Sequence, residues 1–365
     1  MAEAFSIELR IGPAASGAGN YVVEATLEDG GSFTGGRLAL DRAALLAAQL
    51  DADAYGRLLT DALLDGPIAR AYDQAAACAE TLTGGRLRVR LRIDATAAEL
   101  HALAWERLRH RFRGRDIPMA TSALTPFSRY VGLEAAETVP LAERPVRLLV
   151  AVANPADSTP SLAPIDVTRE IELLSEALGV LTADGPLAVT VLPGRTGLPE
   201  KKRTELLEQG YKIEDGPASL DAVRRLLLDH HVLHLVSHGS YRDGEAALHL
   251  EDDDGRWQPV SDQIFVPALA AAGVLPHAAI LVACESAARG EDEVEPFVGL
   301  GPKLVEAGVP AVVAMREQIA MRSAQQVMGD FYCRLMDHGE VDRALNEARL
   351  MLVDDPLADW ATPVL

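Results

Sequence analysis

The chain has 365 residues, 48% hydrophobic and 24% charged, a composition typical of soluble globular proteins and a length that suits two subdomains or one large α/β unit. Its formal net charge of −20 argues against direct contact with nucleic acid, because phosphate binding needs basic patches. No apolar run approaches the ~18 residues of a membrane span, and the first residues do not resemble a signal peptide. We therefore expect no membrane partner. The three cysteines form no CxxC pair and no disulfide framework, so we expect a reducing, cytoplasmic setting.

The first part of the sequence mixes strand and helix patterns. Three segments alternate apolar and polar residues as half-buried strands do: Phe5–Ile11, Tyr21–Leu27 and Leu87–Ile93. Three others carry apolar residues at the i, i+3, i+4 spacing of helices: Asp41–Leu64, Pro67–Leu82 and Ala95–Leu108. We therefore expect residues 1–140 to form an α+β subdomain.

From about residue 141 the pattern changes to short, nearly continuous apolar runs separated by helical segments. The runs suit strands buried on both faces and begin at Val146, Leu187, Val232, Ala278 and Ala311. Helices are expected at 166–178, 220–229, 298–307 and 320–338. This alternation predicts an α/β fold over residues 141–365, with a mostly parallel sheet flanked by helices and its active residues at the carboxyl ends of strands.

Two of these runs end on residues that can react. One ends at His238-Gly239, and another ends at Cys284, 46 residues further on. If the two strands are neighbours, both side chains emerge at one edge of the sheet, where a neutral imidazole can take the thiol proton and leave the nucleophilic thiolate. The backbone N–H groups of Gly239 and Cys284 would then form an oxyanion hole, since glycine lets a substrate carbonyl approach closely.

Each of the two residues also has a plainer interpretation. A histidine at a strand end is often a core or loop residue, and a cysteine there is often a small buried hydrophobe. Their joint occurrence at two strand ends, histidine first, favours a His–Cys pair.

A family resemblance extends over about residues 97–365. The matching segments are LHALAWERL (100–108), VRLLVAVANP (146–155), VLHLVSHGSY (232–241), LHLEDDDG (248–255), ILVACESA (280–287), GLGPKLVEAGVPAVVAMREQI (299–319), FYCRLMDHG (331–339) and DWATPVL (359–365). With these segments the chain resembles the CHAT domain, a caspase-like group related to caspases and separase. The His-to-Cys separation is also near the roughly 50 residues found in caspases.

The resemblance implies a cysteine endopeptidase that cleaves a protein substrate, with His238 as general base and Cys284 as nucleophile. It also implies an inactive caspase-like half within residues 1–140, a regulatory partner or sensor module, and more chain beyond Leu365. The alternative is a catalytically silent caspase-like scaffold that binds a signalling partner. Asp243 or Glu285 could orient His238, but caspase-like sites often lack a firm third member, so we assign no triad.

An acidic stretch follows the predicted nucleophile. It either forms a solvated loop or lines the substrate cleft and attracts a Lys or Arg of the substrate. Its acidic residues are Glu285, Glu291, Asp292 and Glu293.

A second charged stretch, Arg195–Asp215, follows the strand expected at Leu187. It contains the basic run Lys201, Lys202 and Arg203. It is either a plain surface loop or a mobile regulatory loop near the cleft, which reorders or is cut in the basic run on activation.

Metal and cofactor motifs are incomplete throughout the sequence. LEDDDGRW lacks the acids that an EF-hand needs at Leu250 and Ser261, so it favours an Asp-Gly turn. HHVLHLVSH lacks the HExxH pattern of zinc enzymes, and GLGPKL lacks the residues of a nucleotide-binding loop. We predict no metal and no cofactor. Cys78, Cys333 and Trp105 lie in helical patterns and are expected to be packing residues.

Overall fold

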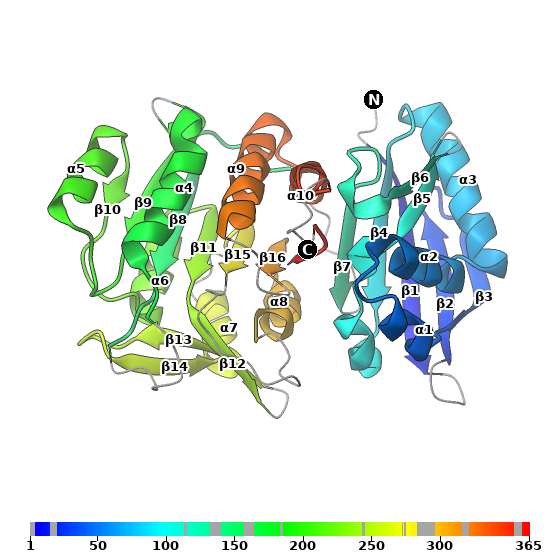
Figure 1. The fold of residues 1–365 in the computed structure, drawn as a ribbon, viewed down its shortest axis with the longest axis horizontal. Coiled ribbons are helices and arrows are strands. Elements are labelled where there is room, and N and C mark those ends of the chain that lie inside the picture. Colours follow the sequence, from blue (N-terminus) through cyan, green and yellow to red (C-terminus); the bar gives the residue numbers. More distant parts are fainter. Residues whose placement is uncertain are drawn as a thin grey trace. The chain divides into compact units, whose positions relative to one another are not determined.

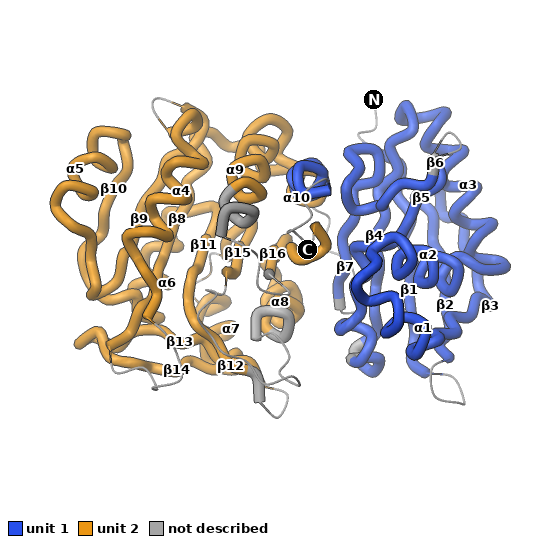
Figure 2. The backbone as a smooth tube through the Cα atoms, in the orientation of Figure 1, with its two compact units in different colours: residues 1–135, 345–353, 365 blue, residues 136–344, 354–364 orange. Residues whose placement is uncertain are grey.

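A computed structural model of the protein describes residues 4–14, 20–112, 115–131, 140–156, 164–182, 185–242, 245–271, 273, 275–282, 296–315, 321–353 and 360–365. The chain divides into two compact units (Figures 1 and 2). Unit 1 comprises residues 1–135, 345–353 and 365, and unit 2 comprises residues 136–344 and 354–364. The division between domains that the sequence predicts at residue 140 stays a prediction, because a compact unit is not yet an independently folding domain.

Unit 1 is built on a five-stranded sheet. Its strands are β1 (Phe5–Ala14), β2 (Asn20–Leu27), β3 (Ser32–Ala39), β4 (Leu87–Ile93) and β7 (Phe127–Val131), in the order β3-β2-β1-β4-β7. The first three strands pair antiparallel, whereas β1, β4 and β7 run parallel. Alternate residues of β1 and β4 are buried, which leaves the sheet one apolar face. The α+β character predicted for this part is confirmed.

Unit 1 also contains α-helices and a hairpin, and the sequence predictions for this unit need one correction at a helix and one at the strand β3. The helices are α1 (Arg42–Ala47), α2 (Ala52–Leu63) and α3 (Gly66–Leu82), and the hairpin joins β5 (Arg109–Phe112) to β6 (Arg115–Pro118). The single helix predicted over Asp41–Leu64 is divided, because the Asp51 side chain accepts a hydrogen bond from the Ala54 N–H and caps a new helix. The strand β3 escaped prediction because Gly35 and Gly36 interrupt its pattern. Gly36 has a packing reason, since a Cβ there would lie 2.3 Å from the Ile68 side chain of α3.

The helix predicted over Ala95–Leu108 is wrong. The segment forms two short 3₁₀ helices, η1 (Ala95–Ala102) and η2 (Trp105–Arg107), and Ala97 has non-helical torsion angles. The indole Nε1 of Trp105 donates to the Leu100 carbonyl at 2.8 Å, and the residue is fully buried. The tertiary burial of Trp105 therefore overrides the helical spacing, although its predicted place in the core is confirmed.

The last helix contributes residues to unit 1 that are distant in sequence. Within α10 (Val341–Leu350), Asn346 Nδ2 donates to the carbonyl oxygens of Ser122 and Thr125 at 3.0 and 2.6 Å. Arg349 is fully buried in the same unit, near the ion pair between Arg129 Nε and Glu106 Oε1 at 3.1 Å. Burial lowers the pKa of Arg349 to about 10.

Unit 2 is built on a seven-stranded sheet in the order β10-β9-β8-β11-β15-β16-β17. All of its neighbours run parallel except β16 and β17. The strands are β8 (Val146–Val152), β9 (Leu187–Leu192), β10 (Lys212–Ile213), β11 (Val232–Val236), β15 (Ala278–Val282), β16 (Val312–Met315) and β17 (Pro363–Val364). The predicted mostly parallel sheet is confirmed.

Helices cover both faces of this sheet (Figure 1). Leu233 and Leu235 of β11 share one core cluster with residues of α6 (Leu220–Leu227), α7 (Asp262–Ala271) and α8 (Pro296–Glu306). His234 points to the other face, where its Nδ1 lies 2.9 Å from the Tyr332 hydroxyl of α9 (Met321–His338). The helix α4 (Val167–Thr182) packs beside α9. The central strand is therefore buried from both sides, as its unbroken apolar sequence predicts.

A small antiparallel sheet, which we call the ribbon, follows β11. It joins β12 (His238–Arg242), β13 (Glu245–Glu251) and β14 (Trp257–Ser261). The turn between β13 and β14 is the predicted Asp-Gly turn, in which Asp252 Oδ1 accepts from the N–H groups of Asp254 and Arg256. The ribbon itself was not predicted, and it carries the candidate general base.

Candidate active site

His238 lies just beyond the central strand of unit 2. β11 ends at Val236, Ser237 follows, and His238 is the first residue of β12. The Ser237 N–H still donates to the Val282 carbonyl of β15 at 3.3 Å, after which the backbone pairs with β13 instead. The single strand predicted through residues 232–239 is thus corrected, because the ribbon takes over the backbone hydrogen bonds at His238. The residue is 3% exposed.

The strand that leads to the predicted nucleophile is the direct neighbour of β11. β11 and β15 run parallel, and Val236 is paired with Val282. His238 is the second residue after Val236, and Cys284 is the second residue after Val282 in the sequence. The condition set by the sequence, that the two strands be neighbours, is met.

Several predicted site residues lie outside the described residues. They are Cys284, the acidic residues Glu285, Glu291, Asp292 and Glu293, and Asp243. The predicted oxyanion donor Gly239 is described and lies opposite Leu248 in the ladder between β12 and β13. The role of its N–H group stays a prediction.

The ribbon has one apolar and one polar face. Leu248 and Leu250 belong to the core cluster of unit 2, so the alternate residues His249 and Glu251 project from the opposite face. The register places His249 directly across from His238. His249 is 6% exposed, its Nε2 lies 3.2 Å from Ser240 Oγ, and its ring meets the Trp257 ring edge-on with centroids 5.6 Å apart.

Glu251 connects the ribbon to the carboxyl edge of the parallel sheet. Its carboxylate is fully buried and accepts backbone hydrogen bonds from Asn154 after β8, Arg195 after β9 and Ala218 before α6, at 3.2, 2.9 and 2.8 Å. Gly194 adjoins it with a φ of +67°, and a Cβ there would lie 2.5 Å from a carboxylate oxygen. Three loops are therefore held by one side chain. The sequence analysis did not single out Glu251. The alternation of apolar and polar residues from Leu248 onward could have indicated it, because that alternation places Glu251 on the face opposite Leu248 and Leu250.

A second buried carboxylate ties the ribbon to the helices beneath it. Asp262, the first residue of α7, accepts from the Ala246 N–H of β13 at 2.8 Å and forms an ion pair with Lys303 of α8. The Asp262 side chain has no exposed surface. The pair therefore joins α8 to the ribbon through Asp262. No pattern in the sequence indicated this pair.

The stretch Arg195–Asp215, expected to be either a surface loop or a mobile regulatory loop, contains two regular elements, and its regulatory role stays a prediction. It folds into α5 (Glu200–Glu208) and the edge strand β10, because β10 pairs in parallel with β9. The guanidinium of Arg203 contacts both carboxylate oxygens of Asp215 at 2.7 and 2.8 Å. Lys202 lies near Glu172 of α4 and is mostly buried, whereas the Lys201 side chain is 91% exposed. In the sheet, β10 is separated from β11 by β9 and β8.

Other residues singled out by the sequence do not join this site. Cys78 and Cys333 are half-buried on α3 and α9, as packing residues can be. Burial and the nearby Asp330 raise the pKa of Cys333, which keeps its thiol protonated. Among the described residues, no group of three or more His, Cys, Asp or Glu side chains is placed to hold a metal ion.

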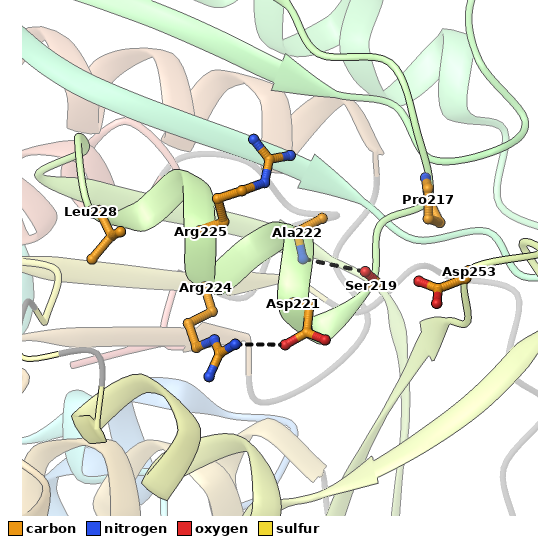
Figure 3. Close-up of a pocket in the computed structure, with 8 residues that line it drawn as sticks. All are labelled: Pro217, Ser219, Asp221, Ala222, Arg224, Arg225, Leu228 and Asp253. Carbon is orange, nitrogen blue, oxygen red and sulfur yellow. Dashed lines mark hydrogen bonds and ion pairs between the residues drawn. The ribbon is translucent and has the colours of Figure 1, made fainter.

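A hollow of about 580 Å³ lies along α6 (Figure 3). Ser219 caps the helix by accepting from the Ala222 N–H, and Arg224 pairs with Asp221. Arg225 points away from that pair in Figure 3. None of the predicted site residues lines this hollow, so it gives no support to a ligand site at His238.

The family model for the CHAT domain matches residues 53–365, which include β11, the ribbon and β15. The chain belongs to the CHAT family. The mixed α/β fold, with its mostly parallel sheet flanked by helices, is the caspase-like fold that a CHAT domain leads one to expect. No curated protein is similar enough to this CHAT chain to count as a match. Within the described part of the chain, every helix is too short or too polar to cross a membrane.

Proposed function

We propose that the protein is a cysteine endopeptidase that cleaves a protein substrate, with His238 as general base and Cys284 as nucleophile. The observation that carries the proposal is the pairing of Val236 with Val282 on adjacent parallel strands. The two reactive residues follow these paired valines at the same distance in sequence. Parallel neighbours deliver such residues to the same edge of the sheet.

The proposed reaction has two stages. The His238 imidazole takes the Cys284 proton, and the thiolate sulfur adds to the carbonyl carbon of the scissile peptide bond. The N–H groups of Gly239 and Cys284 stabilise the tetrahedral oxyanion. The C–N bond then breaks, the amine leaves with the proton held by His238, and a thioester remains. Water, activated by His238, adds to the thioester and releases the carboxylic acid and the free thiol.

The substrate class in this proposal follows from charge. The chain carries a net charge of −20, and Glu285, Glu291, Asp292 and Glu293 lie close after the nucleophile in sequence. A carboxylate at the cleft would pair with Lys or Arg of the substrate. We therefore propose cleavage next to a basic residue, in the cytoplasm, where a catalytic thiol stays reduced. Neither a membrane nor nucleic acid is a direct partner in this proposal.

A regulatory partner or sensor module belongs to the same proposal. His238 is almost completely buried, so a bound substrate would need some opening of its surroundings. A partner that stabilises the open form would switch the enzyme on. The basic run on α5 is the proposed point of self-cleavage, and Lys201 is its most exposed residue. Replacing Lys201, Lys202 and Arg203 with Gln should alter activation or self-cleavage, and a triple variant that behaves like wild type removes this role.

The burial of His238 also favours a second candidate function, a catalytically silent scaffold that binds a signalling partner. Labelling with a thiol-reactive peptide that carries a basic residue distinguishes the enzyme from the scaffold. In the enzyme, Cys284 is labelled by this peptide, labelling disappears in Cys284→Ala, and His238→Gln labels roughly 10²–10⁴-fold more slowly, as expected for a lost acid–base group. Equal labelling rates in wild type and His238→Gln would contradict the proposed base.

The substrate itself is sought by mass spectrometry. New protein termini in a cell extract are compared after incubation with wild type and with Cys284→Ala, with and without extract fractions that supply a partner. Termini that form only with wild type identify the substrate. Identical termini with both proteins under all conditions favour the scaffold.

A further inference from the structure

His238 has a second histidine directly beside it on the ribbon. In the antiparallel pair of β12 and β13, His238 and His249 are opposite residues. Opposite residues of such a pair project from the same face, with Cβ atoms roughly 4.5–5.5 Å apart. Both are nearly buried, at 3% and 6% exposed. The two imidazoles are therefore neighbours in a confined space.

His249 is itself held from two strands. Its Nε2 lies 3.2 Å from the hydroxyl of Ser240, which is two residues after His238 and on the same face of β12. Its ring meets Trp257 of β14 at an interplanar angle of 85°, the edge-to-face arrangement that aromatic rings favour. Because Ser240 contacts the Nε2 atom of the His249 ring and Trp257 packs against the same ring, His249 is a rigid neighbour for His238.

The surrounding strand is also anchored. Glu251, two residues after His249, holds the loops that follow β8 and β9, and Asp262 holds the start of β13 through the Ala246 N–H. Both ends of β13 are thus fixed by buried carboxylates, while His249 lies between them. Because β13 is fixed at both ends, His249 keeps a constant position relative to His238, the residue opposite it on β12.

We propose that His249 is a positioning residue, which confines the His238 imidazole to the orientation needed to take the thiol proton. This inference rests on the proposed function. A general base is effective only within hydrogen-bond reach of the proton it removes, and a displacement of about 1 Å can cost on the order of 10²-fold in rate. His249 acts through its shape and its fixed ring, and it forms no bond to the substrate.

The test measures the alkylation of Cys284 by iodoacetamide as a function of pH, with the Cys284 peptide followed by mass spectrometry so that Cys78 and Cys333 do not interfere. Wild type should react below the pH range of a free thiol, whose pKa is about 8.5. His249→Ala should lose roughly 10²-fold of this rate near pH 6.5 and shift the profile toward that of a free thiol. His249→Phe restores a ring of similar shape and should recover most of the rate.

The controls separate the two proposals and any loss of folding. Gln258→Ala, at an exposed position on β14, should react like wild type. If His238→Gln leaves the alkylation profile of wild type unchanged, the proposed dyad fails and the role of His249 fails with it. If His238→Gln slows alkylation while His249→Ala keeps the wild-type rate and profile, the positioning role alone is overturned. Should His249→Ala not fold, a His249→Phe variant as slow as His238→Gln overturns it equally.

Discussion

At the scale of single residues, a buried carboxylate with three backbone donors holds the edge of the sheet together. Glu251 has no exposed surface, and its partners Asn154, Arg195 and Ala218 come from three different loops. Both carboxylate oxygens of Glu251 thus accept hydrogen bonds from backbone N–H groups, and the partial positive charges of these groups stabilise the buried carboxylate. The loops after β8 and β9 therefore depend on one side chain for their common position.

Glu251→Gln should destabilise the protein. The replacement keeps the size of the side chain but turns one acceptor oxygen into an NH₂ group that faces N–H donors. Leaving buried donors unsatisfied costs about 1–3 kcal/mol, so the free energy of unfolding in urea should fall by this amount. Glu245→Gln, at the exposed start of the same strand, is the matched control and should change it by less than ~0.5 kcal/mol. Equal stabilities of the two variants would contradict the role of Glu251.

At the scale of elements, the contact between β11 and α9 places a histidine in the middle of the core. His234 is buried against Tyr332, and burial lowers its pKa from the ordinary 6.5 to about 4. The imidazole is therefore neutral at physiological pH in the folded protein. It lies on the opposite face of β11 from the core cluster of α6, α7 and α8, so it acts as a packing residue under the sheet.

His234 should make folding stability fall with decreasing pH. Below pH 6.5 the unfolded chain binds a proton at this residue, whereas the folded chain does so only near pH 4. The burial of neutral His234 therefore does not reduce the free energy of unfolding above pH 6.5. Between pH 6.5 and 4 it reduces this free energy progressively, by about 2 kcal/mol at pH 5. Urea midpoints at pH 7 and pH 5 measure this.

The comparison of variants isolates His234 from the other histidines. His234→Gln should show a loss between pH 7 and pH 5 that is smaller than that of wild type by the same ~2 kcal/mol. Tyr332→Phe keeps the histidine buried and should retain the loss of wild type. A His234→Gln variant with an unchanged pH dependence would show that other groups account for it.

At the scale of the whole molecule, the charge of −20 acts on any charged substrate before it reaches the cleft. Such a field raises the rate of encounter with basic peptides, and salt screens it over roughly 10 Å at 0.1 M. For the proposed peptidase, kcat/KM on a peptide with Lys or Arg at the cleaved bond should fall about threefold or more between ~0.02 and ~0.3 M salt.

A peptide library with varied residues at the cleaved bond checks this preference. The expected result is cleavage next to Lys or Arg that weakens with salt, and weaker cleavage in the combined variant Glu291→Gln, Asp292→Asn and Glu293→Gln. Robust cleavage after Asp with no dependence on salt would refute the basic preference, while leaving the His–Cys pair intact.

The sequence alone determined the fold class and most strands of the seven-stranded sheet of unit 2. Apolar runs such as Val232–Val236 and Ala278–Val282 predict buried parallel strands because every residue must tolerate burial, and this constraint is local. The first of these runs also predicted that His238 lies at the carboxyl end of a strand, although β11 itself ends two residues earlier, at Val236. The helix over Ala95–Leu108 failed because the burial of Trp105 depends on the rest of unit 1 and not on spacing.

Only the tertiary structure decided which strands are neighbours and what surrounds His238. The pairing of β11 with β15, the ribbon that places His249 beside His238, and the three loops gathered by Glu251 all join segments far apart in sequence. The incorporation of Asn346 into unit 1 is of the same kind. The periodicity of apolar residues shows which face of a helix or strand is buried. It does not show which group will form hydrogen bonds with a buried polar side chain, because that partner comes from whichever distant segment the fold places beside it.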